Sequence, residues 1–318
     1  MGEEGPEVTN EFDGMSNEEL SKMLADENVS IAKRSRMLWV LREFTDKKAA
    51  IDILKSGLVS ESALLKHELC YVMGQIADEY ALPILTHVLD DVNEDSMVRH
   101  EAGEALGAIS QEDALPILRK YLNDPVREVR ETCELAVKNI EDRLKGHVET
   151  DPDVIAEFQS IDPAPAPRNY KQMTTQELKV IYLDESKSLY ERYKAMFGLR
   201  NRSSVLNDRE ATMAICDGFF TQDGALFKHE VAFVLGQLQK QETADILEKV
   251  LRDPEMHCMV RHEAAEALGS ISNTRSMALL EEFKNDPDQV VKDSCIVAID
   301  MHNYWSNFVH REEETIKD

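Results

Sequence analysis

The sequence contains four adjacent histidine–glutamate pairs at a regular spacing. The pairs are His67-Glu68, His100-Glu101, His229-Glu230 and His262-Glu263. Within each half of the chain the two pairs are 33 residues apart, and the second set follows the first by 162 residues. Neutral imidazoles and carboxylates are ligands suited to iron, zinc or manganese. Because no cysteine accompanies the pairs, a structural zinc site is disfavoured, and we predict a metal centre of another kind.

A glycine follows each of these histidines by seven residues, which is two helical turns. The four positions are Gly74, Gly107, Gly236 and Gly269. A glycine inside a helix costs about 1 kcal/mol relative to alanine. We therefore expect that something approaches the helix backbone closely at these positions. Tight contact between helices is the competing explanation.

The pairs lie in an internally duplicated chain. Residues 96–110 (SMVRHEAGEALGAIS) and 258–272 (CMVRHEAAEALGSIS) are identical at twelve of fifteen positions. The 33-residue spacing is the length of one helix-turn-helix unit of a solenoid. Val98, Ala102, Leu106 and Ile109 follow helical spacing, and strand alternation is absent. The sequence thus predicts an all-α fold, an α-solenoid of eight helical hairpins in two pseudo-symmetric halves of four.

Composition and spacing also predict where the parts of the chain begin and end. Residues 1–28 carry a net charge of −8 and are expected to form an acidic disordered leader. Residues 29–145 are the N-terminal half, and the proline- and acid-rich residues 146–172 are a linker. Residues 173–305 are the C-terminal half, and residues 306–318 are a polar tail.

On the predicted helix His100 lies about 200° from Val98 and from Ala102, so it points away from the apolar seam. The simplest interpretation of such a face is that it is polar and solvated. However, the His-Glu pair occurs only in the middle two units of each half. Flanking units carry Ser35-Arg36 and Tyr193-Lys194 at the aligned positions. The repeat fold therefore does not itself require the pair.

Charge and cysteine content restrict the class of partner and the compartment. The net charge of −25 disfavours nucleic acid and anionic membranes, and it favours a cationic ligand or a basic protein patch. No apolar run approaches the roughly 18 residues of a membrane span, and the acidic N-terminus is unlike a secretory signal. Five cysteines without C-x-x-C spacing fit reduced thiols. We expect a cytoplasmic protein.

Two histidines and one carboxylate per metal leave coordination positions open, the arrangement that lets ferrous iron bind dioxygen. A duplicated chain supplies two such sets. If the halves face each other, the two metals meet at the pseudo-two-fold axis, and we expect them to be the principal tie between the halves. One carboxylate per half then remains for another task, such as binding a substrate amine. A non-catalytic interaction scaffold and a dinuclear hydrolase that activates water remain alternatives.

The motifs ALLKHE…GQ, MVRHEAGEALGAI, ALFKHE…GQ and MVRHEAAEALGSI resemble those of the deoxyhypusine hydroxylase family, whose members consist of short HEAT-like repeats. The resemblance spans roughly residues 30–305. It implies a di-iron monooxygenase that uses two Fe²⁺ ions, O₂ and an external reductant. The implied reaction hydroxylates the deoxyhypusine side chain on the translation factor 5A precursor and completes hypusine. We further expect a monomer.

The resemblance also implies a role for each member of the four pairs. His67, His100 and Glu101 would bind one iron, and a second set, His229, His262 and Glu263, would bind the other. Glu68 and Glu230 would meet the amines of the substrate, although direct metal contact remains open.

Overall fold

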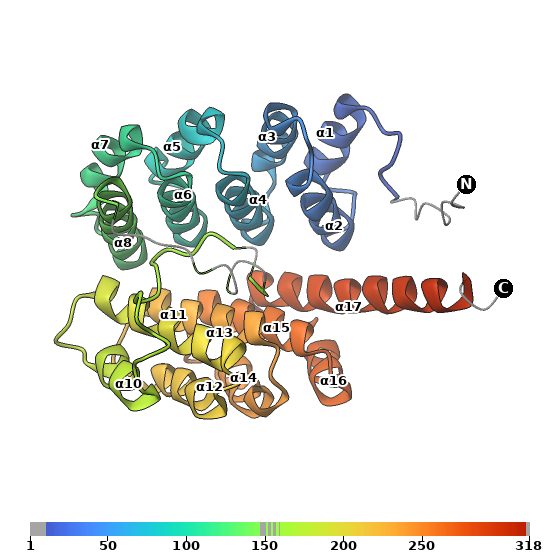
Figure 1. Ribbon diagram of the computed structural model, residues 1–318. Coiled ribbons are helices and arrows are strands. Elements are labelled where there is room, and N and C mark those ends of the chain that lie inside the picture. Colours follow the sequence, from blue (N-terminus) through green and yellow to red (C-terminus); the bar gives the residue numbers. More distant parts are fainter. Residues whose placement is uncertain (1–10, 147–150, 152–153, 155–156, 159, 316–318) are drawn as a thin grey trace, which may run out of the picture.

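The computed structural model describes residues 11–146, 151, 154, 157–158 and 160–315, with side chains up to residue 304. All regular structure in these ranges is helical and comprises sixteen α-helices joined by turns and short 3₁₀ segments. The all-α repeat architecture is thus confirmed. Outer and inner helices alternate along the chain (Figure 1), whereas the division into eight units remains a prediction.

The N-terminal half is a row of hairpins whose inner helices stack on one another. Its outer helices are α1 (Asn17–Ala25), α3 (Lys47–Ser56), α5 (Leu82–Asp90) and α7 (Leu115–Leu118). Its inner helices are α2 (Ile31–Arg42), α4 (Ala63–Ile76), α6 (Ser96–Ile109) and α8 (Arg127–Leu144). Leu69 of α4 and Leu106 of α6 are fully buried in the core between the two layers.

The C-terminal half repeats this arrangement. Its outer helices are α10 (Thr175–Leu183), α12 (Arg209–Cys216), α14 (Ala244–Arg252) and α16 (Thr274–Phe283). Its inner helices are α11 (Leu189–Val205), α13 (Ala225–Leu238), α15 (Cys258–Ile271) and α17 (Gln289–Thr315).

The inner helices of the two halves face each other in opposite order, so that α2 packs against α17 at one end and α8 against α11 at the other (Figure 1). An ion pair of 2.7 Å joins Arg36 to Asp300 at the first end. At the second end the Tyr190 hydroxyl donates to the Asp142 carboxylate at 3.1 Å. Because direct contacts close both ends, the expectation that bound metal is the principal tie between the halves does not hold.

The four helices that carry the His-Glu pairs end in the same way. Each is 14 residues long and is followed by a non-glycine residue with φ between 51° and 54°, ten positions after the histidine. These residues are Ala77, Ser110, Gln239 and Ser272. A left-handed residue is uncommon outside glycine and stops the helix. All four helices therefore present their histidines at the same distance from their C-terminal ends.

A buried arginine immediately precedes the second histidine of each half. Arg99 donates to the Leu89 carbonyl at the end of α5 and forms an ion pair of 2.8 Å with Asp124 in the turn before α8. Arg261 forms the equivalent pair with Asp286. Both arginines are less than one-tenth exposed. The Asn-Asp-Pro turns thus supply a charged partner that fixes α6 and α15 against their neighbouring elements.

Two predicted boundaries differ in the structure. Part of the predicted disordered leader forms α1, which Ser16 begins with a capping box and whose Leu20 and Leu24 are buried against α3. The acidic composition concealed this helix, because two leucines one turn apart are enough to anchor it. Residues 1–10 lie outside the described residues. The predicted polar tail also differs, since α17 continues to Thr315.

The described part of the linker crosses between the halves and is held by two equivalent glutamines. The Ile161 N–H donates to Gln75 of α4 at 2.8 Å, and Gln237 of α13 donates to the Ser160 hydroxyl at 2.8 Å. Gln75 and Gln237 are 162 residues apart and follow the glycines of the repeated motif. Phe158 of the linker is buried.

Candidate metal centre

The four predicted histidines meet at the middle of the interface between the halves. They come from α4, α6, α13 and α15. Neighbouring ring centroids are 5.2–5.8 Å apart, and the separation across the halves from His67 to His262 is 5.4 Å. Metal–imidazole bonds are about 2 Å long, so two rings at this separation can approach one ion.

These histidines do not form a solvated face. His100 and His262 are fully buried, and His67 and His229 are 3% and 6% exposed. They do point away from the seam of their own half, as their helical position predicts, but the opposite half covers them. The sequence of a single repeat contains no information about that cover.

In each half one glutamate reaches the histidine of the preceding unit. A carboxylate oxygen of Glu101 lies 3.2 Å from Nε2 of His67, and Glu263 lies at the same distance from Nε2 of His229. His67, His100 and Glu101 bring one potential ligand atom each to within 4.8 Å of one another. The structure thus brings together the residues that the sequence pairs in the N-terminal half. It makes the equivalent His229–Glu263 contact in the C-terminal half.

The donor atoms fit a metal better than they fit an apo core. Both ring nitrogens of His100, His229 and His262 are buried without a hydrogen-bond partner, as is Nε2 of His67. Buried polar atoms are almost always satisfied, and unsatisfied ones cost about 1–3 kcal/mol each. Such a concentration of unpaired nitrogens, with carboxylates beside them, is the donor set of an iron or manganese site.

The pKa directions agree with metal binding. Burial, followed by the neighbouring imidazoles, lowers the pKa of His100 and of His262 well below the usual value. Both rings are therefore neutral at pH 7, the form that coordinates a metal. Burial lowers the pKa of His67 too, but Glu101 and Glu68 outweigh it and raise that pKa well above the usual value. A metal bound at His67 therefore replaces a proton.

Two further glutamates belong to the site and were not found from the sequence. Glu104 and Glu266 lie one turn after His100 and His262, and a carboxylate oxygen of Glu266 is 3.5 Å from Nδ1 of His262. Burial, and then repulsion from nearby carboxylates, raises the pKa of Glu104, Glu230 and Glu266. The signal was present, because H-E-x-x-E occurs at the second pair of both halves.

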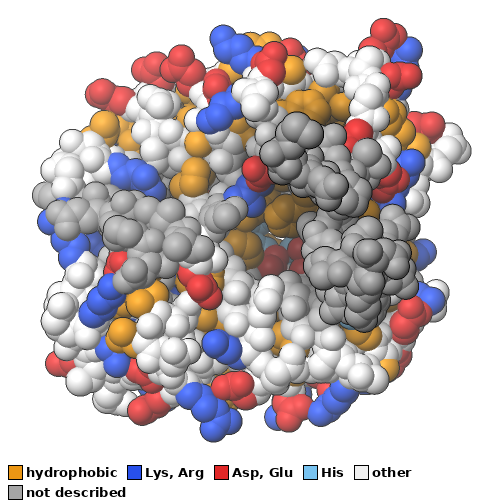
Figure 2. Space-filling view, turned by 45° about the vertical axis from the view of Figure 1, so that its right-hand side comes forward, with side chains coloured by type: hydrophobic (Ala, Val, Ile, Leu, Met, Phe, Trp, Pro, Cys, Tyr) orange, Lys and Arg blue, Asp and Glu red, His pale blue; other side chains and the backbone are white. Residues whose placement is uncertain are grey.

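The carboxylates line a cavity at the centre of the molecule. Its volume is about 460 Å³, and Glu68, Glu101, Glu104, Glu230, Glu263 and Glu266 are among the residues that line it. Figure 2 shows the hollow on one face of the molecule, with acidic and histidine side chains at its floor. Crowded carboxylates in a low-dielectric site favour a cationic occupant.

The four glycines serve helix packing. A Cβ on Gly74 would lie 2.8 Å from the Ala105 Cα, and one on Gly269 would lie 2.7 Å from the Ala298 Cβ. Gly107 and Gly236 meet alanines of the next inner helix in the same way. The competing explanation from the sequence therefore holds. Close helix contact brings successive histidines within reach of one another.

The fold and the site define a class, a helical-repeat protein with a buried histidine–carboxylate centre between its halves. HEAT repeats are detected at residues 51–138 and 217–300. Deoxyhypusine hydroxylase of Dictyostelium discoideum is 44% identical over 91% of this chain and 89% of that protein. The enzyme of Xenopus laevis is 45% identical over 90% of both.

A solved structure carries the same name. The structure of human deoxyhypusine hydroxylase matches with a TM-score of 0.83 at 41% identity, covering 91% of this chain and 96% of that one. The chain belongs to the deoxyhypusine hydroxylase family. Within the described residues, no helix is long and apolar enough to cross a membrane.

Proposed function

We propose that the protein is a di-iron, O₂-dependent monooxygenase that hydroxylates the deoxyhypusine side chain of the translation factor 5A precursor. Family membership supports the substrate, and the buried histidine–carboxylate centre is the observation that carries the chemistry. The proposal includes an external reductant, a cytoplasmic location and a monomeric enzyme. Fully paired helices and a net charge of −25 give no reason to propose nucleic acid or membrane as a partner.

The chain's own residues would hold the metals in two sets. His67, His100 and Glu101 form one, and His229, His262 and Glu263 form the other. When bound, iron with open coordination positions supplies the activation of dioxygen. The residues fix the ligand geometry, because their helices are locked by glycine–alanine contacts and buried arginine–aspartate pairs.

The remaining carboxylates would bind the substrate. Glu68, Glu230, Glu104 and Glu266 surround the central cavity without belonging to the two proposed metal sets. The deoxyhypusine side chain is long and carries amines, so its cationic groups would meet these acids. Charge-assisted hydrogen bonds in a cavity with little water are stronger than the same bonds in solution.

The alternatives differ in what the central residues do. An interaction scaffold gives no role to buried imidazoles whose nitrogens have no partner. A dinuclear hydrolase uses similar ligands to activate water, and it predicts a metal without oxygen chemistry.

One experiment separates the three functions. The purified protein is analysed for metal, its optical spectrum is recorded without and with oxygen, and deoxyhypusine-containing substrate is examined by mass spectrometry. We expect about two irons per chain, oxygen-dependent visible absorption and the gain of one oxygen atom. Absence of stoichiometric metal supports the scaffold. Metal without a visible band, together with unmodified substrate, supports the hydrolase.

A second prediction separates the glutamates. We expect Glu68→Gln to keep iron and to bind substrate about 10- to 150-fold more weakly, the effect of losing a hydrogen bond to a charged group worth about 1.5–3 kcal/mol. Glu230→Gln is expected to behave in the same way. Glu101→Gln and Glu263→Gln are expected to lose iron. If all four variants lose iron equally, the partition is wrong while the metal centre itself stands.

A further inference from the structure

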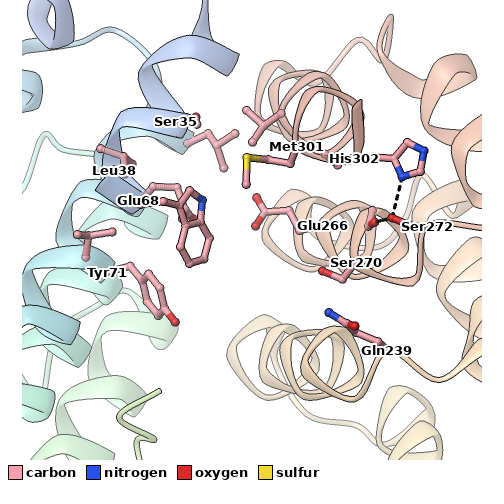
Figure 3. A pocket seen from close by; sticks show the side chains of 16 residues that line it. Ser35, Leu38, Glu68, Tyr71, Gln239, Glu266, Ser270, Ser272, Met301 and His302 are labelled. Carbon is pink, nitrogen blue, oxygen red and sulfur yellow. Dashed lines mark hydrogen bonds between the residues drawn. The ribbon is translucent and has the colours of Figure 1, made fainter. Parts of the chain in front are cut away.

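A duplicated chain with a pseudo-two-fold axis should have two equivalent openings to its centre, but only one side is hollow. A cavity of about 690 Å³ lies between α2 and α4 of one half and α15 and α17 of the other. Glu68, Tyr71, Glu266 and Ser270 line both this outer cavity and the central one. Figure 3 shows Glu68 and Tyr71 on one wall, facing Glu266 and Ser270 on the other.

Bulky and buried residues occupy the equivalent place on the other side. Trp39, which lines the outer cavity, is 47% exposed, whereas its counterpart Phe197 is fully buried. Met301 lines the outer cavity as well. Its counterpart Asn139 is 1% exposed and donates to the Asp162 carbonyl of the linker at 3.3 Å.

The linker completes this plug. The Arg200 guanidinium lies between the rings of Phe158 and Phe197, at 4.4 and 4.7 Å from their centroids. It also binds both carboxylate oxygens of Asp162, at 2.7 and 2.9 Å. A space of only about 10 Å³ remains between the linker and α6 beside Glu104, which is too small for more than one water molecule.

The acids at the centre are therefore not equivalent, although the sequence repeats them. The side chains of Glu68 and Glu266 are 22% and 28% exposed and lie where the outer and central cavities meet. Glu230 is 2% exposed and shares the closed side of the central cavity with Glu104. The passage thus has one acidic pair at its neck and another at its blind end.

We propose that the substrate side chain enters only between α2–α4 and α15–α17, with its inner amine between Glu68 and Glu266 and its terminal amine at Glu104 and Glu230. Tyr71, Trp39 and Met301 then contact the alkyl chain and the adjoining surface of the substrate protein. Two acidic pairs in series match two amines in series, and the apolar walls match the methylene groups between them. This inference rests on the proposed function and specifies how its substrate is oriented.

The test places a removable block at the outer cavity. Iron-loaded Met301→Cys protein is treated with a bulky maleimide, and turnover, KM and iron content are compared before and after. The control is Met213→Cys, because Met213 lies on the outer helix α12 and is 43% exposed. Untreated and treated wild-type protein control for Cys258, which is partly exposed.

We expect labelling of Met301→Cys to raise KM at least about tenfold with iron unchanged, and saturating substrate protein to slow that labelling. Ser270→Trp, which narrows the neck without a reagent, is expected to raise KM similarly. Unchanged KM in both blocked proteins, with no protection by substrate, would overturn the one-sided path while leaving the hydroxylase intact. Absence of turnover in the unblocked wild type would instead overturn the proposed function, and this inference with it.

Discussion

Replacing His100 with alanine is expected to remove at least one of the two proposed irons and to abolish hydroxylation. His100 is fully buried, and neither of its ring nitrogens has another partner, so no described side chain is placed to substitute for it. Loss of a residue that merely supports a metal ligand typically costs about 10- to 100-fold in metal affinity or activity. Loss of the ligand itself is expected to cost more. Metal analysis after desalting and a turnover assay measure the two effects.

His262→Ala is the matched variant in the other half and is expected to give the same result. His87→Ala serves as the control, because His87 is an exposed residue on the outer helix α5. Far-ultraviolet circular dichroism checks that each variant is folded. Full iron retention in both His100→Ala and His262→Ala would reject the ligand assignment.

The positions of the histidines were predictable from the sequence, and their environment was not. Residue type, the 33-residue spacing and the 162-residue duplication are local facts of the sequence. Burial of His67 and His262 depends on the opposite half, which no single repeat encodes. Glu104 and Glu266 were missed because attention to adjacent His-Glu pairs overlooked a third acid one turn later, at the same offset.

The asymmetry of the site was beyond the reach of repeat analysis for a physical reason. Duplication predicts symmetry, whereas the plug comes from residues 157–164, which belong to no repeat. Arg200 and its counterpart Arg42 occupy aligned positions, and only the linker's Phe158 and Asp162 give Arg200 its own environment. Segments that break a repeat pattern are therefore where the structure adds most to the function.

Asp124→Ala is expected to lower the free energy of unfolding by about 3 kcal/mol. The reason is that Arg99, 3% exposed, would be left as a buried charge without its carboxylate partner, a change that costs about 3–5 kcal/mol. Because the pair lies close to the surface, we expect the lower end of that range. Urea unfolding measures the effect, and Asp286→Ala, which removes the partner of Arg261, should repeat it.

The matched control for Asp124→Ala is Asp245→Ala. Asp245 pairs with Arg275 at 2.6 Å, but the two side chains are 73% and 67% exposed, so the loss should not exceed about 1 kcal/mol. A pH series adds a second measurement. Burial tends to raise the pKa of Asp124, but hydrogen bonds from Arg99 and the Val126 N–H outweigh it and hold that pKa below the usual value.

A carboxyl group with a lowered pKa stabilises the folded state above its unfolded pKa, and that stabilisation is lost as the pH falls through the folded pKa. The wild type should therefore lose more stability than Asp124→Ala as the pH falls below about 4. Equal losses of stability at neutral pH for Asp124→Ala and Asp245→Ala would contradict the prediction. The buried pair would then not be what fixes α6, and His100 on it, in place.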